Sequence, residues 1–197
     1  MKKRRIMAYI FDYLFIMMVV VMVGQLKILN PYYDKYVEEY DNYVSLVEKI
    51  DVDKPLSIFS NSEYINSYQQ IMKYSVFVNV ESIICYLLYF VGFQKWNKGQ
   101  SLGKRLFKIK VVDKNNENPK IWQYLVRSGI VYNVFVSILL VINVFLLHGK
   151  IFLVTATILN ILGSAFIYGC LIMCLLRKDG RGLHDLLSGT KVVEYGD

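Results

Sequence analysis

The chain alternates long apolar runs with segments rich in charged residues. A helix needs about 20 predominantly apolar residues to cross a bilayer, and the apolar runs of this length lie at roughly 6–29, 72–94, 122–147 and 151–176. Gly149 separates the last two runs, so a tight hairpin of two spans is expected there. The pattern predicts an all-α membrane protein, a four-transmembrane-helix bundle that forms a single domain over residues 1–197.

Two short segments follow a different period. Apolar residues alternate with lysines from Phe107 to Val111, and this period of two is typical of a strand. Residues 190–193 are similarly rich in β-branched side chains. We therefore expect strands over 107–112 and 189–194. Because two isolated strands are only marginally stable, we expect them to pair with each other as a small β-ribbon that ties the halves of the chain together.

The two predicted strands belong to a repeated segment. GQSLGKRLFKIKVVD (99–113) and GRGLHDLLSGTKVVE (180–194) align without a gap and share Gly99/Gly180, Leu102/Leu183, Leu106/Leu187, Lys110/Lys191, Val111/Val192 and Val112/Val193. Each copy follows two apolar runs, and Arg5 before the first run is matched by Arg127 at the start of the third. We interpret the chain as two copies of one unit related by a pseudo-twofold axis along the membrane normal, an arrangement that occurs in transporters among other folds.

The segment between the first two runs, residues 30–71, is acidic and is an insertion in the first copy. Apolar residues recur in it at helical spacing after Pro31, which predicts an amphipathic helix: Tyr33, Tyr36, Tyr40, Tyr43 and Val47. We expect this helix to cap the bundle or to lie at the lipid headgroups. The alternative is a surface that binds a partner protein, because exposed aromatic stripes often mark contacts.

Charge sets the expected orientation and the expected surroundings. The protein has 197 residues, is 55% hydrophobic and carries a formal net charge of +7. Basic residues gather at Lys2–Arg5 and in the segment 95–121, whereas acidic residues outnumber basic ones in 30–71. The positive-inside rule places both termini, the segment 95–121 and the ribbon in the cytoplasm, and the helical loop 30–71 outside. Because long apolar runs separate the basic clusters, their expected partner is an anionic lipid surface and not nucleic acid.

Three ionisable residues lie well within the predicted spans: Asp12, Glu81 and Arg127. A charged side chain there is costly unless it is paired or hydrated, so each is a candidate ion or proton site. Asp12 lies two helical turns after Arg5 on the same face, and Arg127 enters its span at a similar depth. We expect an Arg5–Asp12–Arg127 cluster, in which Asp12 either neutralises guanidinium groups or binds an ion. Glu81 has no evident cation partner and is expected to be protonated or to line a hydrated cavity.

The glycine-rich turns carry the remaining polar candidates. His184 and Asp185 are adjacent, and adjacent residues on a helix do not face each other, so no catalytic dyad and no enzyme are expected. Asp185 is expected to cap a helix or to pair with Lys104 or Arg105. The turn at Gly99 and Gly103 lacks a phosphate-loop motif, and we expect it to contact lipid headgroups through Lys104 and Arg105.

The cysteines suggest neither a disulfide framework nor a metal centre. The chain has three, Cys85, Cys170 and Cys174, all in apolar runs. No His, Asp or Glu adjoins them in the sequence, so we interpret them as packing residues. No metal and no cofactor is expected.

Three segments resemble the RDD family of bacterial membrane proteins, which is named for one arginine and two aspartates. They are Arg5-x-x-Ala8-x-x-x-Asp12, the turn Gly99–Lys104 leading into Ile109–Val112, and Arg181-x-x-His184-Asp185-x-x-x-Gly189-Thr190-x-Val192-Val193. The resemblance implies that Arg5, Asp12 and Asp185 are the three signature residues. The long acidic loop 30–71 departs from the family pattern.

The resemblance leaves two functions open. The first is transport of ions or small solutes, coupled to protons or sodium through Asp12 and Glu81. Four spans form a narrow bundle, so a pathway would require a homo-oligomer or a partner. The alternative is an accessory or regulatory subunit that binds another membrane protein, such as a protease or a secretion component. The sequence does not separate these two functions.

Overall fold

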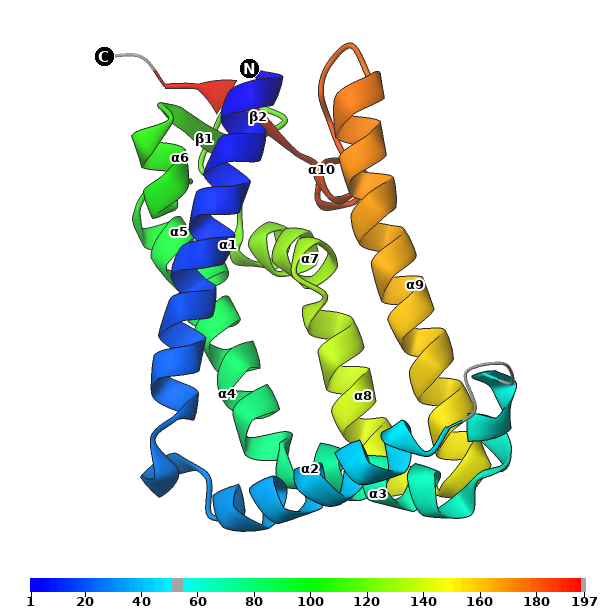
Figure 1. The fold of residues 1–197 in the computed structure, drawn as a ribbon. Coiled ribbons are helices and arrows are strands. Elements are labelled where there is room, and N and C mark those ends of the chain that lie inside the picture. The colour runs from blue at the N-terminus through cyan, green and yellow to red at the C-terminus, as the bar shows by residue number, and fades with distance from the viewer. Residues whose placement is uncertain (51–54, 196–197) are drawn as a thin grey trace. The chain divides into compact units, whose positions relative to one another are not determined.

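The computed structural model describes residues 1–50 and 55–195 and is mostly helical (Figure 1). Asp51, Asp53 and Lys54, which contribute to the charge balance of the acidic loop, lie outside the described residues. The elements are α1 (Lys2–Gly24), α2 (Tyr33–Glu48), α3 (Ser62–Tyr74), α4 (Val76–Leu87), α5 (Gln94–Trp96), α6 (Leu102–Leu106), β1 (Ile109–Asp113), α7 (Ile121–Val131), α8 (Val134–Leu146), α9 (Gly149–Leu176), α10 (Leu183–Ser188) and β2 (Thr190–Glu194). Short 3₁₀ helices cover Lys27–Leu29 and Pro55–Ser60, and a π-helical turn at Leu88–Phe93 joins α4 to α5.

Three helical segments are long and apolar enough to cross a membrane: α1, Val76–Trp96 and α9. The pair α7 and α8 passes the same test as a fourth segment, but it is bent by 69°. The expectation of one continuous helix over 122–147 is therefore wrong. Asn133 explains the break, because its φ of +54° lies outside the right-handed helical region.

Contacts divide the chain into two compact units. Unit 1 comprises Met1–Met22, Ser82–Phe135 and Gly163–Asp197, and unit 2 comprises Val23–Glu81 and Val136–Leu162. Unit 1 holds both copies of the repeated segment, whereas unit 2 holds α2 and α3.

The two strands of unit 1 pair with each other, as expected from the sequence, and the structure shows that they are antiparallel. Val111 faces Val192 in the register, and these two residues are also partners in the sequence repeat. The helix and strand of each copy recur 81 positions apart, at 102 and 183 for the helices and at 109 and 190 for the strands. Because equivalent residues face each other at Val111 and Val192, a local twofold axis passes between these two residues.

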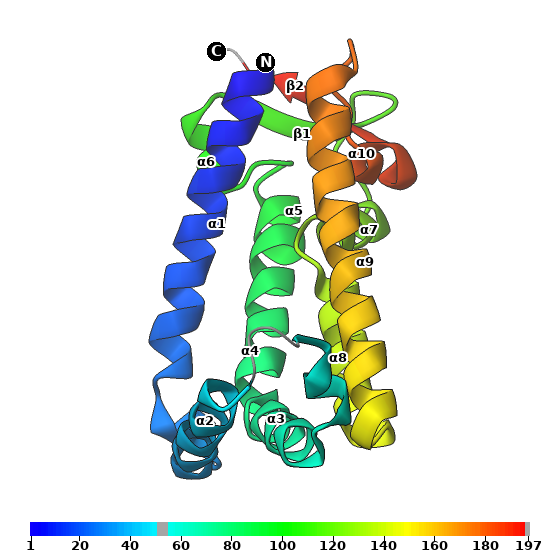
Figure 2. The same ribbon diagram turned by 45° about the vertical axis from the view of Figure 1, so that its right-hand side comes forward.

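The sheet is anchored to the start of α1. The N-terminal end of α1 lies beside β2 (Figures 1 and 2), and the Met1 ammonium and Arg4 lie 3.6 and 3.5 Å from Glu194. Ile109, Val111 and Val192 pack into one core with residues of α1, α7 and the π-helical turn. This core fixes the turns around α6 and α10 against α1 and α7.

Unit 2 contains the predicted amphipathic helix, α2, and a second one that was not predicted. α3 begins at Asn61, whose side chain accepts a hydrogen bond from Tyr64 N at 3.1 Å and caps the helix. Tyr64 and Ile65 pack with Val144 of α8 and with α9. The second apolar run is therefore divided at Ser75 between α3 and α4, and not continuous from residue 72.

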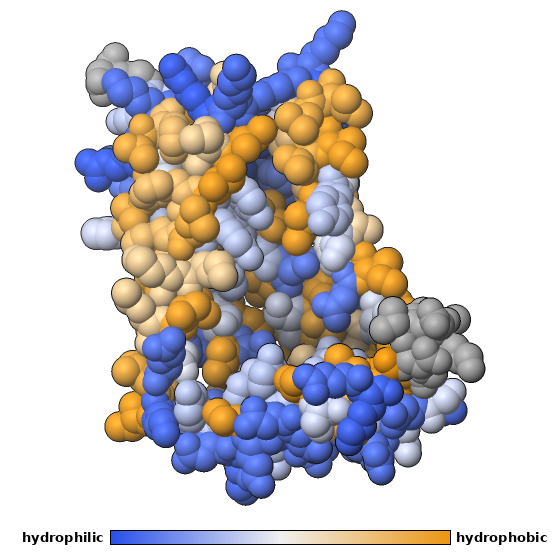
Figure 3. Space-filling model, viewed as in Figure 1, coloured by the Kyte–Doolittle hydropathy of each residue, from blue (hydrophilic) through white to orange (hydrophobic). Residues whose placement is uncertain are grey.

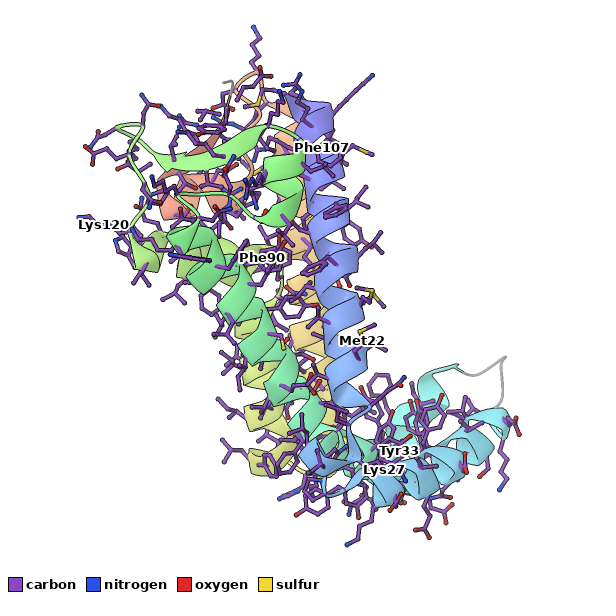
Figure 4. The ribbon with its side chains drawn as sticks, turned by 90° about the vertical axis from the view of Figure 1, so that its left-hand side faces the viewer. Met22, Lys27, Tyr33, Phe90, Phe107 and Lys120 are labelled. Carbon is purple, nitrogen blue, oxygen red and sulfur yellow. The ribbon has the colours of Figure 1, made fainter. Side chains whose placement is uncertain are left out.

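Lys27, in the segment between α1 and α2, makes two interactions with the start of α2. Lys27 Nζ lies 4.9 Å from the centre of the Tyr33 ring, and both side chains are labelled in Figure 4. Lys27 also pairs with Asp34 at 3.1 Å.

Two buried carboxylates and a cationic cavity

Asp12 is fully buried and is surrounded by hydrogen-bond donors. The Tyr89 hydroxyl and the Gly103 N–H donate to its Oδ1 at 2.7 and 2.8 Å, and the Ser101 hydroxyl donates to its Oδ2. Lys104 Nζ lies 3.7 Å from Oδ2 and donates to Ser101 Oγ at 3.1 Å. Three of the four groups are uncharged, so hydrogen bonding provides most of the compensation for burying this carboxylate.

The local sequence around α6 explains how the turn reaches Asp12. Ser101 is the N-cap residue of α6. Gly103 approaches α1 so closely that a Cβ atom would lie 2.5 Å from the Ala8 carbonyl oxygen. Position 103 therefore requires a residue without a side chain.

Asp185 is also fully buried, but its partners are charged. Arg5 and Arg127 each donate to one of its oxygens, and the Gly182 N–H donates to Oδ2 at 3.1 Å. Arg127 Nη1 also donates to Thr190 at 3.1 Å. Burial alone would raise the pKa of the Asp185 carboxyl, but the neighbouring positive charges, above all that of Arg127, hold it well below its usual range. Asp185 is therefore ionised and joins α1, α7 and the α10 turn.

These contacts correct two predicted ion pairs. The Arg5–Asp12–Arg127 cluster is wrong, because both guanidinium groups bind Asp185. Asp185 does not pair with Lys104 or Arg105, because Lys104 lies beside Asp12. Arg5 and Asp12 are seven residues apart, about 10 Å along the helix axis, which is far enough for each to meet a different turn.

The contact of the first turn with lipid headgroups stays a prediction, and the residues named for it differ in burial. Lys104 and Gly103 are buried, whereas Arg105 is exposed. Gly99 is buried with a φ of +93°, and its carbonyl accepts a hydrogen bond from Val111 N at 2.9 Å. The glycines therefore serve close packing of the turn, and Arg105 is the basic residue of the turn that is exposed at the surface.

Unit 1 encloses a cavity of about 160 Å³ between α1, α7 and α9. The space-filling view shows a recess between the apolar surfaces of α1 and α9, with hydrophilic residues inside it (Figure 3). The walls are mostly apolar and include Ile6, Tyr9, Phe90, Val131, Ile167, Leu171 and Leu175. The charged residues of the lining are Lys2, Arg5, Lys104 and Arg127, and no described carboxylate lines it.

The cations of the lining outnumber the carboxylates behind it. Asp12 and Asp185 offset two of the four positive charges. Arg127 uses Nη1 for its bonds to Asp185 and Thr190, while its Nη2 and Nε have no hydrogen-bond partner among the described residues. Burial lowers the pKa of Lys104 to about 8, and the charges of Arg127 and Arg5 act in the same direction. The cavity therefore favours an anion.

His184 also lines the cavity, and one of its ring nitrogens is buried behind the lining. Its Nε2 lies 3.4 Å from Asp185 Oδ2, and its buried Nδ1 has no hydrogen-bond partner among the described residues. Burial, followed by the charge of Arg127, lowers the pKa of His184 to about 3, so the ring is neutral at physiological pH. With the proton on Nε2 facing the carboxylate, Nδ1 carries a lone pair that is buried within the protein.

The same region contains the set of described side chains that could hold a metal. Cys174, His184 and Asp185 bring ligand atoms within 4.8 Å of one another. No His, Asp or Glu adjoins Cys174 in the sequence, but the fold brings His184 and Asp185 close to it. Asp185 is already bound by two guanidinium groups, and their charge would oppose a cation at this place.

Glu81 belongs to unit 2 and is not part of this site. Its Oε1 is buried and has no hydrogen-bond partner among the described residues. The role predicted for Glu81 as an ion or proton site stays a prediction.

Sequence reasoning missed Tyr89 and Ser101, which hold Asp12. The Ser101 hydroxyl could have been identified as an N-cap three residues before Lys104. Nothing local marks Tyr89, which lies 77 residues from Asp12.

The match to known proteins covers nearly all of this structure. The model of the RDD family matches residues 3–189, which include both carboxylates, both turns and the apolar helices. No curated protein and no solved structure matches the chain. The extent of the family match and the apolar helices together show that the chain belongs to the RDD family and indicate a membrane protein.

Proposed function

We propose that this RDD protein is a multi-pass protein of the bacterial cell membrane that binds an anionic amphiphile in the cavity of unit 1. The single observation that carries the proposal is the lining: apolar walls together with guanidinium donors that have no partner among the described residues. An acidic headgroup would accept hydrogen bonds from Arg127 and lie near Lys104. Its hydrocarbon part would pack on α1 and α9.

The proposed orientation places the cavity at the cytoplasmic leaflet. Basic residues flank the N-terminal end of α1 and fill the segment between Val76–Trp96 and α7. Both termini and the sheet would then be cytoplasmic, with α2 and α3 outside. Acidic lipids of the inner leaflet would be attracted to this side by the surplus positive charge.

Thiol labelling tests the orientation. In a variant without the three native cysteines, Ser45→Cys and Ser62→Cys should react with an impermeant reagent added to intact cells, and Asn115→Cys should react only after lysis. Labelling at position 115 in intact cells would overturn the orientation.

The contacts of the carboxylates support amphiphile binding over cation exchange through Asp12. A sodium or proton site needs carboxylate oxygens that are free to bind the cation. The oxygens of Asp12 accept hydrogen bonds from Tyr89, Ser101 and Gly103, and those of Asp185 bind two arginines. We therefore assign both carboxylates to the support of the cavity wall. Transport of the bound amphiphile remains compatible with this assignment.

The test is to block the cavity and identify the lipids that co-purify. Leu171→Trp fills the cavity from α9, whereas Ile172→Trp adds the same volume at a neighbouring exposed position outside the lining. Acidic lipid should be recovered at close to one molecule per chain from the wild type and the Ile172 variant, and several-fold less from the Leu171 variant. Equal recovery from all three proteins would contradict the proposal.

A second candidate function, binding to another membrane protein, is favoured by one observation on α2. Val37, Tyr40, Val44 and Val47 are 36–47% exposed and recur at intervals of three and four residues. Such a stripe suits packing against an apolar helix of a partner. Val44→Asp should then remove a partner captured by cross-linking in cells, whereas Glu38→Asp should not. If Val44→Asp leaves the cross-linked species unchanged, this second function is wrong.

A further inference from the structure

We infer that the anionic amphiphile is a lipid phosphomonoester, whose phosphate carries two negative charges at neutral pH. This inference rests on the proposed function, because it concerns the same cavity. It starts from the number of positive charges in the cavity lining that no neighbouring carboxylate offsets. An uncompensated charge in a largely apolar site is costly, so the charge of the ligand should match this number.

Three cations of the lining lie close together although they come from different elements. Arg5 of α1 and Arg127 of α7 bind the two oxygens of the same Asp185 carboxylate, so their guanidinium groups are neighbours. Lys104 of α6 lies within electrostatic reach of both, because their charges lower its pKa. All three cations line the same cavity, so one headgroup can interact with more than one of them.

Lys2 adds a fourth cation to this group. It precedes Arg5 by three residues on α1, and side chains at this spacing lie on one face of a helix. Its Nζ donates to Leu175 O of α9 at 2.7 Å, and both residues line the cavity. A carbonyl oxygen carries no net charge, so this hydrogen bond leaves the positive charge of Lys2 uncompensated.

Two positive charges of the lining remain after the carboxylates are counted. Asp12 offsets the lysine beside it, whereas Asp185 offsets only one of its two arginines. The second guanidinium charge and that of Lys2 therefore form the surplus. Glu194 and Asp179 do not reduce it, because they pair with basic groups outside the lining.

The size of the surplus selects among anionic lipids. A fatty-acid carboxylate and a phosphodiester each carry one negative charge, which would leave one cation without compensation. A lipid pyrophosphate carries more negative charge than the surplus. A phosphomonoester has a second pKa of about 6, so it is close to a dianion at neutral pH. Its three terminal oxygens can accept hydrogen bonds from basic groups on different elements.

The experiment compares two lipids that differ by one ionisable proton. Phosphatidic acid is a phosphomonoester, and phosphatidylmethanol with identical acyl chains is a phosphodiester. Binding of each to the purified full-length protein in neutral detergent would be measured by native mass spectrometry at pH 7 and pH 5. We expect phosphatidic acid to bind about tenfold more tightly at pH 7, and the ratio to fall severalfold at pH 5, where the monoester is mostly a monoanion.

The phosphodiester is the control for the protein's own titration. The pKa of Lys104 is about 8 and that of His184 is about 3, so both side chains keep their predominant charge state between pH 5 and pH 7. Phosphatidylmethanol should therefore bind equally at the two pH values. A ratio that does not change with pH would contradict the assignment of a dianion.

Two variants locate the charges that produce the preference. Lys2 lines the cavity, whereas its neighbour Lys3 is exposed and lies outside the lining. Lys2→Gln should lower the ratio between the two lipids severalfold, and Lys3→Gln should leave it unchanged. Equal ratios in the two variants would show that the surplus charge of the lining does not select the ligand.

The outcomes separate this inference from the proposed function. If the wild type binds both lipids equally at pH 7, the phosphomonoester assignment is wrong and the amphiphile proposal stands. If it binds neither, the amphiphile proposal itself fails. Glycerol 3-phosphate distinguishes a lipid from a free phosphomonoester: we expect it to bind at least about a hundredfold more weakly than phosphatidic acid, and equal binding would overturn the assignment to a lipid.

Discussion

The turn around α6 and the turn around α10 have related sequences, recur 81 positions apart and end in paired strands, yet they hold their carboxylates in opposite ways. In the first copy the carboxylate, Asp12, comes from α1, and the turn supplies a lysine, Lys104. In the second copy the turn supplies the carboxylate, Asp185, at the position equivalent to Lys104, and α1 and α7 supply arginines. The acidic and basic partners have thus exchanged elements between the copies.

This exchange explains the charge of the cavity. Hydroxyl and N–H groups donate most of the hydrogen bonds to the Asp12 carboxylate. Lys104 contributes an ion pair in which its Nζ lies 3.7 Å from Asp12 Oδ2. Asp185 instead binds two guanidinium groups at one place, and Arg127, which lines the cavity, keeps donors without a partner among the described residues. A repeated backbone therefore produces one neutral, hydrogen-bonded centre and one centre with surplus positive charge.

The largest loss of stability should come from removing the charge of Asp185. Asp185→Asn leaves two buried guanidinium groups without their counter-ion, and breaking a buried pair in this way costs about 3–5 kcal/mol. Chemical or thermal unfolding of the purified protein in detergent measures this loss. Asp179→Asn is the matched control, because Asp179 pairs with Arg177 at the surface and exposed pairs contribute little.

The corresponding substitution in the first copy, Asp12→Asn, should lower the free energy of unfolding by less. Asp12→Asn keeps one acceptor oxygen for Tyr89 and Gly103 but leaves Ser101 and Lys104 facing an amide. The loss of hydrogen bonds at a buried position corresponds to about 1–3 kcal/mol. If Asp12→Asn destabilises the protein more than Asp185→Asn does, the contrast between the two centres is incorrect.

Ser101→Ala should have a smaller effect again. It removes the N-cap of α6 and one donor to Asp12, and losing a cap costs about 1 kcal/mol. Ser164→Ala on the exposed surface of α9 is the control and should leave the unfolding transition unchanged. Equal stability of Ser101→Ala and the wild type would show that the turn does not depend on this hydroxyl.

The smallest predicted effect is a pH dependence of lipid binding. Lys104 has a pKa lowered to about 8, and a bound anion favours its charged form. Affinity for an acidic lipid should therefore be highest below pH 8 and should fall severalfold as the pH rises from 7 to 9, because a proton must then be taken up on binding. Titrations across this range test the prediction, and a constant affinity would separate Lys104 from the ligand.

Local sequence patterns predicted the elements of this fold better than their contacts. The apolar runs were visible from their length, and the strands and the helix after Pro31 from their periodicity. The pairing of the strands followed from the low stability of isolated strands. The break at Asn133 and the start of α3 at Asn61 were not, because single residues with special backbone or capping roles interrupt a pattern that remains apolar. Hydropathy alone does not reveal such single residues within an apolar run.

The sequence identified the residues of the candidate site but not the contacts between them. Asp12, Arg5, Arg127 and Asp185 were all identified, but their pairing was assigned by depth along single helices. The turns decide it instead, since α10 brings Asp185 to Arg5 and Arg127. The exchange of Lys104 and Asp185 at equivalent repeat positions was present in the alignment and would have indicated that the two copies pair their charges differently.

The most direct test of the central claim is the stoichiometry of lipid binding to the wild-type protein. Native mass spectrometry in neutral detergent would compare an acidic phospholipid with phosphatidylcholine of the same acyl chains. The cationic cavity predicts one tightly bound acidic lipid per chain, with at least about a tenfold preference over the zwitterionic lipid. Equal binding of the two lipids, or graded binding of many acidic lipids without a first tight one, would contradict the claim.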